Sequence, residues 1–328
     1  MKHYLGVDAG GSKTYAMITN ELGEIVGKWH SGNGNHQINY DEARANIGES
    51  VRLALHQAGL DPGGIESACF GLAGADRPVD FSILRPMIGE LGFAKYDIVC
   101  DTMIAMRAGT SRSYGVVLIC GSGTNSAGRN RQGEDYQCGG FDYQFGDFGG
   151  GWTLAVEAFR SVIRAWDGRE RPTLLTGLLL EYLGYDSVLK MFNDYLDNGK
   201  SVPVDVTKLI FQAAGQGDEV SLAILRRQGE ELGKSACAVI ERLNMREETF
   251  DIVLAGSVVT KGEGPYITDC IRAAVRGLAP NASLLKLRTE PVIGALWMAM
   301  EAEGTPLNRS VYERLSQVTD YHDVHSRT

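Results

Sequence analysis

The amino-acid sequence predicts an α/β protein built from two similar domains with a cleft between them. The chain has 328 residues, and a domain usually holds roughly 100–200 residues. Strand-like and helix-like segments alternate, and an apolar strand followed by a glycine turn occurs twice, ending near residues 8 and 120. Glycine is abundant, with 41 residues, but it follows no collagen-like period. We therefore expect the extra glycines at turns where the backbone approaches a ligand.

The first half of the chain is predicted to contain three strands, a helix, a strand, a helix and a strand. Apolar alternation or continuous apolar runs predict the strands, and apolar residues at helical spacing predict the helices. The expected segments are strands 3–8, 14–19 and 25–29, helix 40–58, strand 65–72, helix 81–91 and strand 96–100. This is the element order of a ribonuclease-H-like domain.

The second half restarts the same pattern, which predicts a structural repeat. Strand 114–120 is followed by a turn at 121–123 and by strand 124–129. The remaining expected segments are helices 152–166, 206–214 and 220–243, strand 250–254, and helices 265–278 and 291–302. No low-complexity linker separates the halves, so we expect them to pack closely.

Composition argues against several classes of protein. The net charge of −9 disfavours nucleic-acid binding, which needs a basic surface. No apolar run approaches the roughly 18 residues of a membrane span. Asp8 occurs too early for a signal peptide, so we expect a cytoplasmic protein. The six cysteines are dispersed without a C-x-x-C pair, which predicts reduced thiols rather than disulfides or a metal site.

The first glycine turn lies in GVDAGGSKT at 6–14. A P-loop would need lysine directly after the second conserved glycine and then a helix, but Ser12 intervenes and a strand follows. A glycine hairpin can instead direct backbone N–H groups at anionic oxygens. Asp8, at the end of the strand, could hold Mg²⁺, which prefers carboxylate, water and phosphate oxygens. The alternative is an ordinary tight hairpin.

The second turn, in LICGSGTN at 118–125, repeats the pattern of the first. Two such turns, one in each half of the chain, are stronger evidence for a phosphate site than either turn alone. Two such hairpins could grip the two ends of a polyphosphate across a cleft. Asp101 ends the strand 96–100 at a loop mouth, which is a common position for a general base. Its alternative role is the N-cap of the following helix.

Two further segments carry site-like signals. The run 139–151 contains six glycines and Asp147 and precedes a helix. We interpret these glycines as positions of close backbone approach to a ligand, whereas Asp147 could also be a solvated loop carboxylate. A strand-to-loop glycine follows in LAGSV at 254–258.

Taken together, these segments resemble the N-acetylglucosamine kinase group of the BadF/BadG/BcrA/BcrD ATPase family, within the superfamily of sugar kinases, heat-shock chaperones and actin. The similarity covers almost the whole chain. It rests on GVDAGGSKT at 6–14, GNGNH at 32–36, GLAGADRP at 71–78, Asp101, CGSGTNS at 120–126, the glycine run with Asp147, AGQGD at 214–218 and AGSVV at 255–259. The resemblance implies two actin-like ATPase domains, at 1–114 plus about 306–328 and at 115–305, with a C-terminal helix that returns to the first domain.

The resemblance also assigns roles to residues of this sequence. It implies ATP and Mg²⁺, with Asp8 as the metal residue and Asp101 as the catalytic base. The implied nucleotide-binding residues are Gly10, Gly11, Ser12, Lys13, Thr14, Gly121, Ser122, Gly123, Thr124, Ala214, Gly256 and Ser257. The implied sugar-binding residues are Asn35, His36, Asp101, Asn125, Gly139, Gly140 and Asp147.

The implied activity is ATP-dependent phosphorylation of an N-acetylglucosamine-like sugar at its 6-hydroxyl. The alternatives are a glucosamine or N-acetylmuramate kinase, an ATPase that activates a partner enzyme through an iron–sulfur cluster, and a noncatalytic sensor. The partners are then ATP and a small sugar, and a homodimer is common in the group. Two departures concern the sugar. Phe148 and Gly150 stand where many members have an acid and a hydroxyl, and Phe141-Asp142 stands where Trp-Gly is usual.

Overall fold

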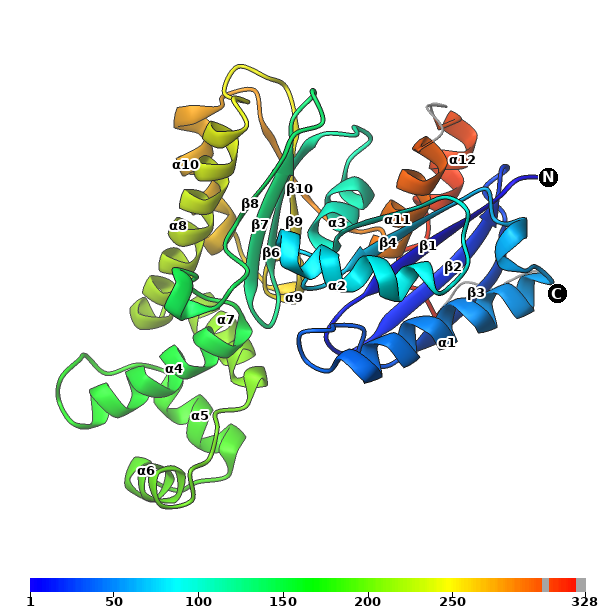
Figure 1. Cartoon of the computed structure of the whole chain (residues 1–328). Coiled ribbons are helices and arrows are strands. Elements are labelled where there is room, and N and C mark those ends of the chain that lie inside the picture. The colour runs from blue at the N-terminus through cyan, green and yellow to red at the C-terminus, as the bar shows by residue number, and fades with distance from the viewer. Residues whose placement is uncertain (303–306, 323–328) are drawn as a thin grey trace. The chain divides into compact units, whose positions relative to one another are not determined.

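The computed structural model describes residues 1–302 and 307–322. Contacts within the chain divide it into two units (Figure 1). Unit 1 comprises Met1–Val117 and Leu287–Thr328, and unit 2 comprises Leu118–Lys286. Each unit is described by itself below, and the cleft expected between them stays a prediction.

Unit 1 holds a five-stranded sheet in the order β3-β2-β1-β4-β5. Strand β1 pairs antiparallel with β2 and parallel with β4, so the chain leaves β1 through a hairpin and returns beside it after a helix. The elements are β1 (His3–Ala9), β2 (Thr14–Asn20), β3 (Ile25–Ser31), α1 (Tyr40–Ala58), η1 (Pro62–Gly64), β4 (Ser67–Leu72), α2 (Pro78–Gly89), β5 (Tyr96–Cys100), α3 (Asp101–Gly109), α11 (Pro291–Glu301) and α12 (Arg309–Leu315). The order predicted for the first half is confirmed.

Helices cover both faces of this sheet. Leu5 and Val7 join the apolar side chains of α1 and α2 in one core. Gly6 points to the opposite face, where a Cβ atom would lie 2.8 Å from the backbone nitrogen of Leu296 in α11. Because a glycine permits this approach, α11 packs directly on β1. The sheet edge that bears Asp8 is thereby held between two layers.

The domain boundaries differ from those expected from the sequence. Helix α11 lies in the range 115–305 that was expected to form the second domain, but it contacts β1, β4 and α3 of unit 1. The chain instead crosses between units after Val117 and after Lys286. Helix α12 packs on unit 1, where Val311 touches Gly23 and Arg314 donates to the Leu22 carbonyl. Residue 306 and residues 323–328 of the expected tail lie outside the described residues.

Unit 2 repeats the sheet topology of unit 1, in the order β10-β9-β6-β7-β8. Helices α8 and α10 pack together beside this sheet (Figure 1). The elements are β6 (Gly115–Cys120), β7 (Thr124–Arg129), β8 (Asp135–Cys138), η2 (Tyr143–Phe145), α4 (Gly151–Trp166), α5 (Leu175–Leu183), α6 (Val188–Asp197), η3 (Val204–Val206), α7 (Thr207–Gly215), α8 (Glu219–Arg242), β9 (Asp251–Ala255), α9 (Ser257–Lys261), α10 (Tyr266–Leu278) and β10 (Ser283–Lys286). The predicted structural repeat is therefore present.

Among the helices of residues 1–302 and 307–322, none has both the length and the apolar character that crossing a membrane requires.

Candidate active site

Two carboxylates lie at one edge of the unit 1 sheet. Asp8 comes near the end of β1, and Asp101 is the first residue of α3, directly after β5. Strands β1, β4 and β5 run parallel, so their carboxyl ends meet at the same edge. Burial, together with the negative charge of Asp101, raises the pKa of Asp8 to about 7, although Lys13 opposes the shift. Burial likewise raises the pKa of Asp101.

The thiol of Cys100 lies between two acids. Its Sγ atom is 3.2 Å from Asp76 Oδ1 and 3.3 Å from Asp101 Oδ1. Burial and the two neighbouring carboxylates raise the pKa of the thiol, so it stays protonated and can donate to either acid. Cys100 is the N-cap residue of α3. Asp101 is therefore not the helix N-cap, which was the alternative role considered for it from the sequence. Sequence reasoning missed Asp76, although this acid stands in the glycine-containing loop after strand β4.

The first hairpin is a tight turn whose residues 11–13 are exposed. Gly10 donates its N–H to the Lys13 carbonyl at 2.9 Å, and Gly34 donates to the Gly10 carbonyl at 2.8 Å. Burial would lower the pKa of Lys13, but its hydrogen bond to Tyr15 and the nearby acids raise it. The hydroxyl of Thr14 donates inward to the Gly32 carbonyl at 3.0 Å, so Thr14 holds the neighbouring loop.

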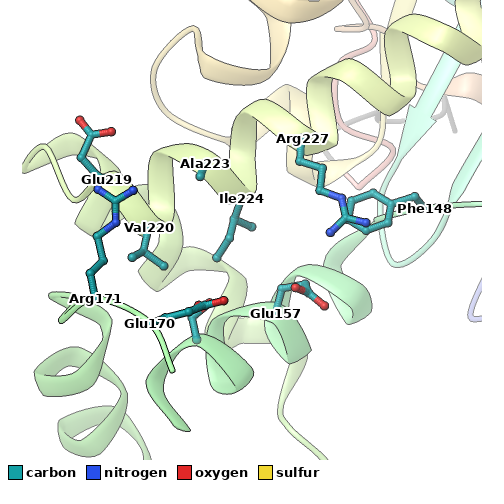
Figure 2. A pocket seen from close by; sticks show the side chains of 10 residues that line it. Phe148, Glu157, Glu170, Arg171, Glu219, Val220, Ala223, Ile224 and Arg227 are labelled. Carbon is teal, nitrogen blue, oxygen red and sulfur yellow. The ribbon is translucent and has the colours of Figure 1, made fainter. Parts of the chain in front are cut away.

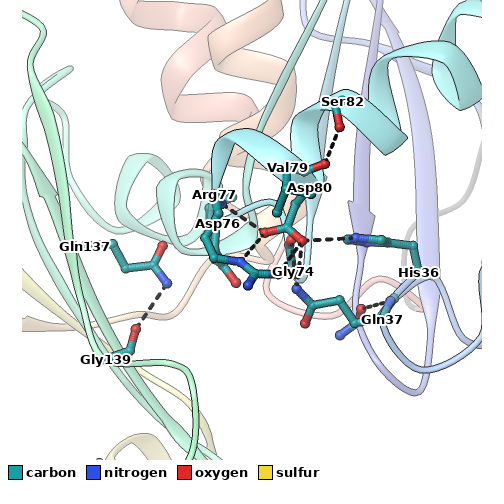
Figure 3. A network of polar contacts seen from close by, with 12 residues as sticks. His36, Gln37, Gly74, Asp76, Arg77, Val79, Asp80, Ser82, Gln137 and Gly139 are labelled. Carbon is teal, nitrogen blue, oxygen red and sulfur yellow. Dashed lines mark hydrogen bonds and ion pairs between the residues drawn. The ribbon is translucent and has the colours of Figure 1, made fainter. Parts of the chain in front are cut away.

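Residues 33–37 form a loop that is fastened to α2 (Figure 3). The buried His36 ring has its Nε2 atom 3.5 Å from Asp80 Oδ1. Arg77 holds that carboxylate through bonds of 2.9 and 3.0 Å, and this hydrogen bonding lowers the pKa of Asp80 to about 2. Gln37 Nε2 donates to the same carboxylate at 3.2 Å and fastens the loop, whereas neither ring nitrogen of the buried His36 has a hydrogen-bond partner in the described chain.

Asn33 and Asn35 each keep a side-chain donor without a partner in the described chain, and Asn35 is the less buried of the two. Its side-chain oxygen accepts from the Gln37 N–H at 2.8 Å. Its side-chain nitrogen makes no hydrogen bond within the described part of the chain. Asn35 can therefore offer that amide to a ligand.

The second hairpin, in unit 2, packs against the N-termini of two helices, α4 and α9, whose N-cap residues are Gly150 and Gly256. Gly151 donates its N–H to the Gly121 carbonyl at 2.7 Å, and Trp152 donates to the Ser122 carbonyl at 3.2 Å. A Cβ atom on Gly256 would lie 2.5 Å from the Cys120 carbonyl oxygen. The hairpin thus sits against the N-termini of α4 and α9, and Thr124 begins the next strand, β7.

A hollow of about 660 Å³ opens beside this hairpin, and its volume lies within the range of small-molecule sites. It brings together Gly121, Ser122 and Ser257 of the predicted nucleotide set. Its lining residues are Gly121, Ser122, Gly151, Val204, Asp205, Thr207, Lys208, Phe211, Gln212, Gly215, Ser257, Val258, Lys261, Gly262 and Glu263. Ala214, also predicted to border the nucleoside, is buried and does not line this hollow, and its carbonyl accepts from the Tyr266 hydroxyl at 3.3 Å.

Sequence reasoning missed the contribution of helix α7 to this hollow. Lys208, Phe211, Gln212 and Gly215 all line it. Their spacing of three, four and seven residues places them on one helix face. That mixed polar and aromatic face was the available signal.

The glycine run 139–151 is crowded by protein atoms. Asp147 Oδ2 accepts N–H bonds from Gly140, Phe141 and Asp142 at 3.0, 2.7 and 2.7 Å. A Cβ atom on Gly140 would lie 2.5 Å from Asn125 Nδ2. Gly139 and Gly140 therefore leave room for the side chains of Asp147 and Asn125, and Asp147 organises the loop. The alternative of a solvated loop carboxylate therefore does not describe Asp147 Oδ2, whereas the approach of these glycines to a ligand stays a prediction.

Asn125 has an orphaned group in this region. Its buried Oδ1 atom has no hydrogen-bond partner in the described chain. Asn125, Asp147 and Phe148 line a small hollow between β7 and α8. An unpaired buried acceptor costs free energy, which a donating ligand hydroxyl could offset.

Phe148 opens onto a second hollow of about 380 Å³ between α4 and α8 (Figure 2). The Arg227 guanidinium lies over the Phe148 ring, 4.2 Å from its centroid. Two acids of the hollow are paired, Glu157 with Arg160 and Glu170 with Arg164. Arg227 has no acidic partner among residues 1–302 and 307–322. An unpaired positive charge therefore stands over the ring of Phe148.

Comparison of the chain with protein families and with known proteins identifies its family. The model of the BadF/BadG/BcrA/BcrD ATPase family matches residues 5–299. The chain belongs to this family. It is 29% identical over 303 residues to the N-acetylmuramic acid/N-acetylglucosamine kinase of Clostridium acetobutylicum, covering 91% of this chain and 98% of that one. It is 29% identical over 316 residues to the N-acetyl-D-glucosamine kinase of Dictyostelium discoideum, covering 92% and 98%.

The fold of this family member also matches solved structures. A Chromobacterium violaceum protein described as a candidate N-acetylglucosamine kinase superposes with a TM-score of 0.65 at 22% identity, covering 91% of this chain and 99% of that one. The shared fold confirms the predicted architecture of two α/β domains of the actin-like ATPase type.

Proposed function

We propose that this protein is an ATP-dependent kinase that phosphorylates an amino sugar of the N-acetylglucosamine type at its 6-hydroxyl. The observation that carries the proposal is the pair Asp8 and Asp101 at one sheet edge, beside the Lys13 hairpin. Asp8 would hold the Mg²⁺ that binds the phosphates, and Asp101 would accept the proton of the accepting hydroxyl. Family membership and the two kinase relatives support the same activity.

Asp101 is the proposed general base. Burial raises its pKa, and a base is more effective when its pKa approaches the working pH. The Cys100 thiol lies within hydrogen-bond distance of its carboxylate and can orient it by donating to Oδ1. Asp101 would accept the proton of the sugar hydroxyl as that oxygen attacks the terminal phosphorus of ATP and ADP leaves.

Asp8 is the proposed residue for Mg²⁺, and its surroundings fit a cation. Its pKa of about 7 arises from burial and from the charges of Asp101 and Glu290, and a bound cation would relieve that repulsion. No group of three or more His, Cys, Asp or Glu residues in the described chain could hold a metal. Nucleotide-bound Mg²⁺ needs only one or two carboxylates, because phosphates and waters complete its shell. When bound, Mg²⁺ neutralises charge on the triphosphate.

The hollow beside α7 and α9 is the proposed nucleoside site. Phe211 offers an aromatic face and Lys208 a positive charge. The backbone N–H groups of Gly11 to Lys13 and of Ser122 to Thr124 would serve the phosphates, while the Gly10 N–H closes the first hairpin on the Lys13 carbonyl. Asn35 and Asn125 keep polar atoms free for sugar hydroxyls.

A coupled assay of ADP release tests this function. The sugars are N-acetylglucosamine, glucosamine, N-acetylmuramate, N-acetylmannosamine and glucose. Asp101→Asn should lower kcat by about 10²–10⁴-fold while ATP affinity changes little. Asp97→Asn, on the same strand but exposed, is the matched control and should behave like wild type. Absence of turnover on every amino sugar would overturn the proposal.

One observation favours a second acceptor. Arg227 places an unpaired positive charge over the ring of Phe148, and Phe148 lines the same small hollow as Asn125 and Asp147. N-acetylmuramate differs from N-acetylglucosamine by a lactyl group that bears a carboxylate. An acidic amino sugar is therefore the second candidate substrate.

A further inference from the structure

The last described residues of the chain lie against the strand that carries Lys13. The Tyr321 ring stacks on the Tyr15 ring, with centroids 4.0 Å apart and planes 10° from parallel. Tyr15 is the second residue of β2, two positions after Lys13. A segment more than 300 residues away in sequence therefore borders the first hairpin.

Tyr321 is fixed at several points. Its side chain is buried, and its hydroxyl lies 2.9 Å from the Ala16 carbonyl and 2.6 Å from the Trp29 carbonyl. Its own carbonyl accepts from Lys28 Nζ at 2.7 Å. Its N–H donates to Glu290 Oε1 at 3.3 Å. These contacts fasten the segment to β2, β3 and the start of α11.

The segment reaches Lys13 through one hydroxyl. Lys13 Nζ donates to Tyr15 Oη at 3.1 Å and lies 4.4 Å from the centroid of that ring. The same Tyr15 Oη lies 3.3 Å from His322 Nε2. Tyr15 thus contacts the lysine on one side and the C-terminal segment on the other.

The same segment also touches the charges around the hairpin. Glu290, which accepts the Tyr321 N–H, acts electrostatically on both Lys13 and Asp8 and helps to raise the pKa of each. One acid is therefore shared between the C-terminal segment and the phosphate end of the site.

We propose that Tyr15, Tyr321 and His322 are positioning residues that hold the Lys13 ammonium in place for the phosphates of ATP. This proposal rests on the proposed kinase function. A lysine side chain loses conformational entropy when it is ordered. Holding Lys13 beforehand removes that cost from the reaction, and misplacing a reacting group by about 1 Å can cost roughly 10²-fold in rate. Tyr321 and His322 then act on the phosphate site through Tyr15.

A double-mutant cycle tests the link. Lys13→Ala, Tyr15→Phe and the double variant are compared by kcat and by KM for ATP. Tyr15→Phe keeps the aromatic stack and removes only the hydroxyl. It should lower kcat/KM for ATP by about tenfold and leave KM for the sugar unchanged. In the Lys13→Ala background the same change should have no further effect.

Two more variants serve as a second test of the link and as a control for the loss of a tyrosine hydroxyl. His322→Ala should act in the same direction as Tyr15→Phe, and it should also lose its effect when Lys13 is alanine. It keeps the test available if Tyr15→Phe does not fold. Tyr96→Phe, which removes an exposed hydroxyl elsewhere in unit 1, should match wild type.

The outcomes separate the two proposals. If wild type turns over ATP with an amino sugar but Tyr15→Phe is unaffected, the positioning role is wrong. An effect of Tyr15→Phe that persists in full on Lys13→Ala contradicts it as well, because the hydroxyl would then act independently of the lysine. A wild type without sugar-dependent ATP turnover overturns the kinase function, and with it this role.

Discussion

The Sγ atom of Cys100 lies 3.3 Å from the Oδ1 atom of Asp101, within hydrogen-bond distance of the proposed base. The thiol has a raised pKa and thus remains a donor at neutral pH. Its hydrogen bond lowers the pKa of Asp101, against the larger upward effect of burial. A buried cysteine next to the site therefore tunes the base.

Removing this donor should shift the pH dependence of the reaction. In Cys100→Ala the pKa of Asp101 rises further, so the base becomes ionised only at higher pH. The acidic limb of kcat/KM should move to higher pH, and kcat at neutral pH should fall by about tenfold because Asp101 is less well oriented. Cys100→Ser, which keeps a donor, should retain the wild-type limb. An unmoved limb in Cys100→Ala would show that the thiol does not act on Asp101.

Asp8 should make the protein less stable as pH rises. Its pKa in the folded protein is about 7, against an ordinary value of 3.8. The folded state then binds more protons than the unfolded state between about pH 4 and pH 7, so stability falls across that window. Asp8→Asn should raise Tm by a few degrees, roughly 2–8 °C, at pH 8 and leave it nearly unchanged at pH 4.

The pH scan of thermal unfolding has a kinetic counterpart. Asp8→Asn should also lose most Mg²⁺-dependent ATP turnover, since it removes the proposed metal carboxylate. Asp97→Asn is again the control and should follow the wild-type curve. A variant that is stabilised equally at pH 4 and pH 8 would contradict the electrostatic origin of the effect.

The core strands of both units were predictable because apolar runs and glycine turns mark them. Strands β8 (Asp135–Cys138) and β10 (Ser283–Lys286) were missed because each lies at a sheet edge and is only four residues long, without a buried residue that would mark an apolar run. Edge strands need no apolar alternation. The placement of α11 was also missed. It depends on Gly6 and Gly294, which permit close packing at long sequence distance, and no local pattern records that.

The candidate site likewise contains residues that local sequence predicts and residues that only long-range contacts reveal. Asp8, Asp101 and the hairpin glycines stand at strand ends, where local sequence suffices. Asp76 and Tyr321 were missed because their roles arise only from contacts with Cys100 and Tyr15. Asp147 was identified as important, but its bonds to three loop N–H groups could not be foreseen from spacing.

Arg227 should select for acidic sugars. A charge-assisted hydrogen bond contributes about 1.5–3 kcal/mol, so Arg227→Gln should raise KM for N-acetylmuramate by roughly 10–100-fold and leave KM for N-acetylglucosamine unchanged. The matched control is Arg226→Gln, because Arg226 lies next to it in sequence and pairs with Glu219 at 3.9 Å. Equal changes for both sugars would show that Arg227 supports the loop through Phe148 rather than binding a carboxylate.

Asp142 should carry backbone strain in the loop that holds Asp147. It has φ 97° and ψ 163°, a region that is essentially restricted to glycine and costs of order 1–3 kcal/mol for other residues. Asp142→Gly and Asp142→Ala both remove the carboxylate and its bond to the Tyr143 N–H. The glycine variant should therefore be more stable than the alanine variant by about 1–2 kcal/mol, after the greater unfolded-state entropy of glycine is subtracted.

Chemical denaturation of the two variants measures this difference. Asn198, at an ordinary φ of −102°, is the control site, where alanine should be at least as stable as glycine. If alanine also equals glycine at position 142, the loop relaxes without strain. If glycine is favoured there and sugar KM rises in Asp142→Gly, the strained backbone holds the loop in its sugar-binding form, because relieving the strain frees the loop that Asp147 organises.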